Sequence, residues 1–393
     1  MTLIKVLEYL KEYVFFAFLV VPIFVGFAFG EGLVYDATPL NFYEASTPSF
    51  PVGLIFVSLM FLYLLPKLKL DVWHFIALFV FLFYFILSVT TPVIMRSLPV
   101  FLGMAVPICN YYIVKNKLLK SRPDIDFFEM LKKIIWTIIW LKFLTDLIFH
   151  NSLATDLFLF EDIAIYNFYD YFPFIYTLGL ILVISDSIAS KKITIFRILT
   201  VLICVLVTMS AHSRLYQGVI ILAPVFLMFL TLVPLRTKSL IYFFVVIFSL
   251  ITVIIGVFYY DYFPGDSSLE IRFGHWYGFF STLTIPDLIL PLFNSYRLSL
   301  DYGTTHNELL EIYSLFGLGF FLYLKTVADI FSYGRDQDRA LSQTIITVLL
   351  IGTLIQLNMT NPYVGLLWST LLATLHYGRR KPEKVKEVVV EGK

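Results

Sequence analysis

Two adjacent residues, His306 and Asn307, stand directly before an apolar segment that carries the glycines Gly317 and Gly319. Imidazole titrates near neutral pH, and a helix N-terminus disfavours its cationic form, so His306 is suited to act as a general base. Asn307 could orient His306 or the hydroxyl that gives up its proton. The glycines would let a neighbouring helix pack closely and fix the helix that presents His306. The alternative is a structural role, in which His306 only caps or packs.

The elements that position these residues are expected to be membrane helices. Hydrophobic residues fill 59% of the 393 positions, whereas soluble domains contain about 45–50%, and the mean hydropathy is +0.84. The apolar runs are continuous, as helical spans require. We therefore expect an all-α polytopic membrane protein of about 12 transmembrane helices. The runs lie at residues 13–30, 51–66, 72–90, 98–114, 134–149, 172–189, 198–211, 217–234, 240–260, 307–325, 340–358 and 362–378.

The distribution of charge orients these helices. Basic residues concentrate in short cytoplasmic loops, and this pattern places both termini in the cytoplasm. Only four of the 29 Lys and Arg residues are then expected outside: Arg96, Arg214, Arg272 and Arg297. The planar guanidinium group matches phosphate oxygens in a bidentate manner, so these arginines indicate a phosphate ligand. The alternatives are headgroup anchoring for Arg96, and pairing with outer acids for Arg272 and Arg297.

The chain is expected to form one transmembrane domain, residues 1–378, followed by a charged cytoplasmic tail, residues 379–393. Residues 261–306 form a long outer loop, and its piece 277–293 is amphipathic enough to lie along the membrane surface as short helices. A loop of this length is more often functional than connective. The first apolar run is interpreted as a retained helix rather than a cleaved signal.

Several kinds of chemistry are disfavoured by the sequence. There is no Walker loop and no dinucleotide fingerprint. Cys109 and Cys204 lie inside apolar runs, which argues against a disulfide framework. The histidines expected outside lack the spacing of a zinc site, so no metal is predicted; they are His150, His212, His275 and His306. No cofactor and no nucleic-acid partner are expected.

The segment from His306-Asn307 to Gly317 resembles the signature of the bacterial O-antigen ligase/polymerase superfamily. The Ser213-Arg214 turn, the Arg272…Trp276 start of a long outer loop and twelve spans with both ends inside are also similar to that family. In the family, two residues separate the glycine at the position of Gly317 from a second glycine. Here one residue separates Gly317 from Gly319, so the second glycine comes one residue early. This departure weakens the resemblance to the ligase branch more than to the superfamily.

The resemblance implies a GT-C-like, metal-independent, inverting glycosyltransferase of the bacterial inner membrane, with a periplasmic active site and a glycan on undecaprenyl diphosphate as donor. By carry-over, Arg214 and Arg272 would bind the diphosphate, and His306 would deprotonate the attacking sugar hydroxyl. The other residues expected to bind substrate are Arg297, Asn307, His212 and His275. Membrane lipids are expected partners, and a chain-length regulator protein that binds the long loop is left open.

Three functions fit the expected architecture. An O-antigen or related surface polysaccharide polymerase is preferred, because the outer face is acidic apart from its arginines. A ligase whose acceptor is the many-phosphate lipid A core would favour a more basic outer face. A flippase or other transporter also fits twelve spans, but carriers usually place ionisable residues mid-membrane. Here the fifth span offers mainly Lys142 and Asp146, which can pair with each other on one helix face.

Overall fold

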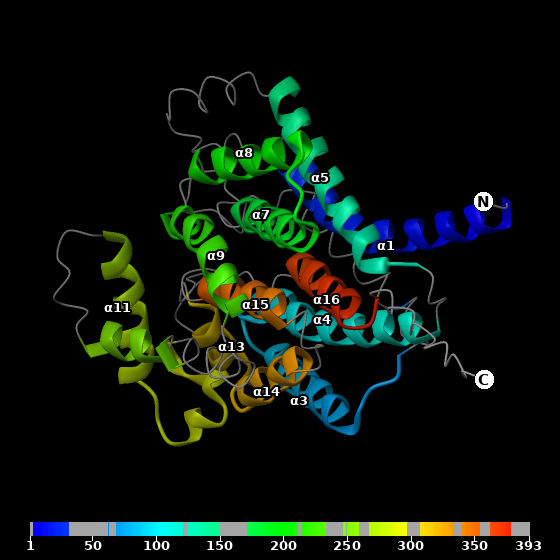
Figure 1. The fold of residues 1–393 in the computed structure, drawn as a ribbon. Helices are drawn as coiled ribbons and strands as arrows, with labels where there is room; N and C mark the ends of the chain where they lie inside the picture. The colour runs from blue at the N-terminus through cyan, green and yellow to red at the C-terminus, as the bar shows by residue number, and fades with distance from the viewer. Residues whose placement is uncertain are drawn as a thin grey trace, which may run out of the picture.

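The computed structural model is built of α-helices and short 3-10 turns (Figure 1). It describes residues 3–30, 62, 68–120, 125–149, 171–210, 214–232, 247–248, 250–258, 267–296, 307–332, 339–353 and 362–378, and these residues contain no β-strand. The all-α prediction is therefore confirmed. Among the same residues, no helix combines the length and the apolar character needed to cross a membrane.

The helix bounds follow the apolar runs of the sequence in most places. The α-helices are α1 (Leu3–Gly30), α3 (Val72–Ser88), α4 (Ile94–Lys120), α5 (Phe127–Phe149), α7 (Tyr171–Ser190), α8 (Ile195–Ser210), α9 (Arg214–Leu232), α11 (Ser267–Ser281), α13 (Glu308–Phe316), α14 (Gly319–Ser332), α15 (Arg339–Thr353) and α16 (Pro362–Tyr377), and the 3-10 turns are η4 (Pro286–Leu288) and η5 (Pro291–Phe293). Residues 250–258 are also helical.

Helix α4 is longer than the apolar run at 98–114 that predicted it, because its last turns have partners in α1. The Lys117 ammonium pairs with Glu12 at 2.7 Å and lies 4.1 Å from the centre of the Phe15 ring. Such contacts keep polar residues helical beyond an apolar run. Hydropathy alone therefore underestimates the length of this helix.

The α4–α16 pair has the most extensive helix–helix packing among the described elements. Gly365 of α16 lies so close to the ring of Pro107 that a Cβ atom there would overlap it. Asn110 of α4 donates from Nδ2 to Ser369 Oγ and to Thr370 Oγ1, each at 2.8 Å. A small residue and a set of hydroxyl groups thus bring two uninterrupted helices together, as in packed helical bundles.

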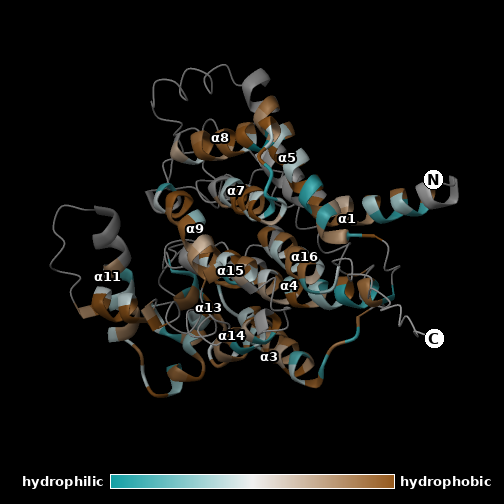
Figure 2. Cartoon of the chain, viewed as in Figure 1, coloured by the Kyte–Doolittle hydropathy of each residue, from teal (hydrophilic) through white to brown (hydrophobic). Residues whose placement is uncertain are grey.

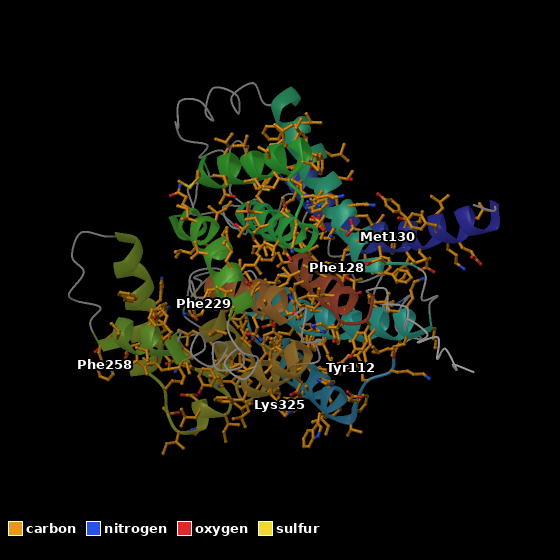
Figure 3. The ribbon with its side chains drawn as sticks, viewed as in Figure 1. Tyr112, Phe128, Met130, Phe229, Phe258 and Lys325 are labelled. Carbon is orange, nitrogen blue, oxygen red and sulfur yellow. The ribbon has the colours of Figure 1, made fainter. Side chains whose placement is uncertain are left out.

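The remaining helices form two groups around this pair. Helix α7 packs against α5, α8, α9 and α15, while α3 packs against α4, α13 and α14. Near the start of α5, where Phe128 and Met130 are buried (Figure 3), Lys132 pairs with Asp186 of α7, and Asp186 also pairs with Arg197 of α8. These basic residues belong to the segments expected in the cytoplasm.

The single helix predicted over residues 307–325 is instead two helices. Helix α13 ends at Phe316, and α14 begins at Gly319 and continues to Ser332. Gly317 stands between them with φ 47° and ψ −122°, a conformation that residues with a side chain rarely adopt. This break corrects the expected role of the glycine pair, because Gly317 interrupts the helix that was expected to continue through it.

Candidate functional site

Asn307 caps the start of α13. Its Oδ1 accepts a hydrogen bond at 3.0 Å from the backbone N–H of Leu310. The cap satisfies one of the N–H groups that a helix start leaves unpaired, and it fixes where the chain enters the helix. His306 precedes this cap in the sequence but lies outside the described residues, and the expected role of Asn307 in binding stays a prediction beside its capping role.

Two carboxylates are buried in the first turns of α13. Glu308 is 0% exposed and Glu311 is 1% exposed, and neither is without a partner. Their spacing places them on one face of the helix, and the helix N-terminus favours negative charge. A buried carboxylate also requires cations or hydrogen-bond donors around it. Neither carboxylate stands among the site residues predicted above, since an acid between apolar residues carries no sign of its burial in the sequence.

The C-terminal end of α13 meets the loop of residues 282–294 at Gly317. A Cβ atom on Gly317 would overlap the carbonyl oxygen of Ile289 and would lie 2.8 Å from the hydroxyl of Tyr84. That hydroxyl donates to the Ile289 carbonyl at 2.8 Å and accepts from the backbone N–H of Leu318 at 3.3 Å. Tyr313 donates in the same way to the Leu288 carbonyl at 3.2 Å. We call Tyr84, residues 282–294 and residues 307–318 the α13 corner.

The loop in the α13 corner is shaped by short polar contacts. Asp287 accepts hydrogen bonds at its Oδ2 from the backbone N–H and the hydroxyl of Thr284, at 2.8 and 2.7 Å. These bonds hold the pKa of Asp287 below its ordinary value. Thr282 donates to Oδ1 of the buried Asn294 at 3.1 Å. Between these contacts, Leu292 of η5 is buried, and η5 packs against α13.

Helix α11 carries the residues predicted at the start of the long loop. Phe273, Trp276 and Phe279 form a small apolar cluster with Leu310 of α13 and Val253. This cluster joins α11 to α13. Figure 1 shows α11 at the edge of the molecule. This helix begins ten residues before the segment 277–293, in which short surface helices were expected.

His275 of α11 lies beside the hydroxyl of Tyr296. Its Nδ1 lies 3.3 Å from the hydroxyl of Tyr296, and burial raises the pKa of Tyr296, so this hydroxyl stays neutral at physiological pH. Gly278, one turn further along α11, faces the same tyrosine ring. His275 thus stands beside a residue that directly precedes Arg297 in the sequence, while Arg297 itself lies outside the described residues.

Arg214 is the first residue of α9. Gln217, three residues later, donates from Nε2 to the carbonyl of Met209 at 2.8 Å, which ties the start of α9 to the end of α8. A helix N-terminus presents free N–H groups and favours an anion. The side chains of Arg214 and Arg272, and all of His212, lie outside the described part of the chain.

The structure therefore brings together the start of α13, which carries Asn307, and helix α11, which carries His275. The loop of residues 282–294 lies against α13 as well. Helix α9, which carries Arg214, packs against α7, α8 and α15. Within the described ranges, no group of His, Cys, Asp and Glu residues could hold a metal ion.

Comparison with known proteins gives no match, because no protein-family model, curated protein or solved structure is significantly similar to this chain.

Proposed function

We propose that this protein is a polytopic inner-membrane glycosyltransferase, an O-antigen or related surface polysaccharide polymerase. It transfers the growing glycan from undecaprenyl diphosphate to the sugar of a lipid-linked repeat unit at the periplasmic face. The observation that carries the proposal is the sorting of charge, since the cations expected outside are arginines and one of them, Arg214, opens a helix. An arginine and helix N–H groups are suited to a lipid diphosphate.

The surface of the helices supports a membrane setting. Large apolar side chains are exposed on several helices, among them Phe79 of α3 and Phe229 of α9, and Phe258 is 75% exposed (Figure 3). Figure 2 shows that hydrophobic residues predominate along α8 and α9. An exposed apolar surface of this kind is costly in water and favourable in lipid.

The proposed reaction is a direct displacement at the anomeric carbon of the donor. The acceptor hydroxyl oxygen forms a bond to this carbon as the bond to the diphosphate oxygen breaks, and the configuration inverts. His306 takes the hydroxyl proton, and undecaprenyl diphosphate leaves with the bonding electron pair. Arg214 and Arg272 hold the charge that develops on the diphosphate, which is the larger contribution, while the base contributes about 10²–10⁴ in rate.

The residues around this chemistry are assigned to substrate binding. Arg297 would add a further contact to the diphosphate, while His212, His275 and Asn307 would contact the sugars. No metal and no cofactor take part in this scheme.

Deletion of the gene tests the proposal. The lipopolysaccharide of the deletion strain is examined by gel. Core that bears a single repeat in place of the ladder identifies this chain as the polymerase. Bare core with long chains left on the lipid carrier identifies it as the ligase, and an unchanged ladder rejects both.

A further inference from the structure

Helix α13 is too short, and too sharply broken from α14, to be oriented by chain continuity alone. It has nine residues, from Glu308 to Phe316, and Gly317 follows with a positive φ of 47°. The backbone at Gly317 can turn in ways that other residues resist. Contacts from other parts of the chain must therefore set the direction in which α13 presents its N-terminal end.

One hydroxyl group makes two hydrogen bonds at the break between α13 and α14. Tyr84 is 4% exposed, and its Oη joins the Ile289 carbonyl on one side and the Leu318 N–H on the other. The N–H of Leu318 lies just past the end of α13, where a helix leaves backbone groups without regular partners. The same atom thus ties α3 to the outer loop and to the start of α14.

Small movements at this point become large at the other end of α13. At 1.5 Å per residue the helix is about 14 Å long, so a tilt of about 5° at Gly317 moves the N-cap by about 1 Å. A displacement of this size at a catalytic group costs about 100-fold in rate. The proposed base, His306, directly precedes this N-cap in the sequence.

We propose that Tyr84 is a positioning residue of the glycosyl transfer: its hydroxyl fixes the broken helix and thereby the N-cap Asn307, which directly follows the proposed base His306 in the sequence. This inference rests on the proposed function. Tyr84 acts through α13 and does not touch substrate, because it binds the end of α13 opposite to Asn307. It sets the geometry of the base, while the affinity for the donor is set by arginines on α9 and α11.

The test compares Tyr84→Phe with a matched variant, Tyr112→Phe. Tyr112 is equally buried in α4 and its hydroxyl bonds to His74 at 2.7 Å and to Asp71 at 3.0 Å, at the opposite end of α3 (Figure 3). Each substitution removes one hydroxyl and keeps the ring. Both proteins are purified in detergent and assayed with lipid-linked repeat units extracted from the deletion strain.

For Tyr84→Phe we expect kcat to fall about 10- to 100-fold while the KM for the lipid-linked substrate is unchanged. Tyr112→Phe should keep the kcat of the wild type. A kcat close to that of the wild type for Tyr84→Phe overturns the inference. An equal fall in both variants overturns it as well, because it would reflect only a loss of packing.

Amide hydrogen exchange gives a readout that does not depend on activity. Tyr84→Phe should speed exchange at Leu318 and along α13, and Tyr112→Phe should not; unchanged exchange in Tyr84→Phe overturns the inference. Tyr313→Phe, which removes the parallel bond to Leu288, should show a smaller effect of the same kind. If His306→Ala abolishes polymer but Tyr84→Phe keeps the kcat of the wild type, the inference fails alone. If the deletion strain keeps its ladder, the proposed function fails.

Discussion

The α4–α16 pair and the α13 corner are both held by hydrogen bonds from side chains, but the main acceptors of these bonds differ. In the pair, Asn110 bonds to the side chains of Ser369 and Thr370 across two uninterrupted helices. In the corner, Tyr84 and Tyr313 bond to backbone carbonyls of a loop. The geometry of the pair therefore depends on the types of its side chains, which the sequence states. The geometry of the corner depends instead on the position of the backbone of a loop that is distant in the sequence.

This difference separates stability from activity. Substitutions in the α4–α16 pair should lower the free energy of unfolding and leave the catalytic rate of the folded protein unchanged. Substitutions in the α13 corner should lower the rate even where they leave the stability unchanged, since the proposed base His306 directly precedes the corner in the sequence. The following predictions test that separation.

The largest effects are expected from His306→Ala, Arg214→Ala and Arg272→Ala. Loss of the base costs about 10²–10⁴ in rate, and loss of a charge-stabilising group about 10²–10³, so each should remove the polymer from a gel while protein remains in the membrane. Arg214→Lys should also fail, because lysine cannot bind in a bidentate manner. Normal polymer from His306→Ala would exclude His306 as the base and leave His212 or His275 as the next candidates.

Gly317→Ala should damage the corner strongly. The added Cβ would overlap the Ile289 carbonyl in a positive-φ conformation, which we expect to cost about 3 kcal/mol and most of the activity. Thermal unfolding in detergent and the polymer assay measure both. Gly319→Ala is the control, because its Cβ would stay 3.5 Å from its nearest neighbours; equal losses in the two variants would contradict the role of Gly317.

Asn110→Ala should affect stability alone. It removes bonds to two hydroxyl groups in the α4–α16 pair, which should lower the free energy of unfolding by about 1–3 kcal/mol. The apparent melting temperature should fall while kcat stays that of the wild type. A clear fall in kcat would show that the pair and the corner are coupled, and the comparison drawn above would be wrong.

Gly278→Ala should have a smaller effect, confined to α11. A Cβ atom there would press against the ring of Tyr296, and such overpacking costs about 1 kcal/mol or more. Displacing Tyr296 should also raise the KM for the lipid-linked substrate, since Arg297 follows it. Gly274→Ala in the same helix meets open space and should leave both the melting temperature and KM unchanged.

The smallest effect concerns the Thr284–Asp287 contact. Because the pKa of Asp287 is lowered from its ordinary 3.8, the contact stabilises the fold above that pH and loses this contribution as the pH falls through the lowered pKa. Thr284→Ala should therefore be less stable than the wild type at pH 7, by at most about 0.5 kcal/mol at this solvent-accessible position. The difference in melting temperature should disappear in acid; a constant difference would assign it to packing.

The sequence predicted the helices best where packing and hydropathy agree. The apolar runs at 72–90, 172–189 and 362–378 nearly coincide with α3, α7 and α16. Each run is long, continuous and bounded by polar residues or proline, so its ends are marked locally. Helix α4 is the exception among the well-matched runs, because contacts with Glu12 and Phe15 extend it beyond its apolar part.

The candidate site was less predictable, for a physical reason. The His306-Asn307 pair marked the start of α13, and the Asn307 cap is a local interaction that the sequence can suggest. The break at Gly317 is different, because it is made by Ile289 and Tyr84, which are far away in the sequence. The sequence shows both glycines. Only the fold shows that Gly317 leaves room for the Ile289 carbonyl, whereas Gly319 is part of a helix.

The Tyr84 contacts also determine when the site can form during synthesis. Tyr84 and Leu318 are 234 residues apart, and a ribosome adds about 5–20 residues per second. Leu318, whose N–H is bound by the Tyr84 hydroxyl, is therefore synthesised about 10–50 s after Tyr84. The α13 corner is thus assembled late, and the nascent chain cannot carry out the proposed transfer until residue 318 of its 393 residues has been made.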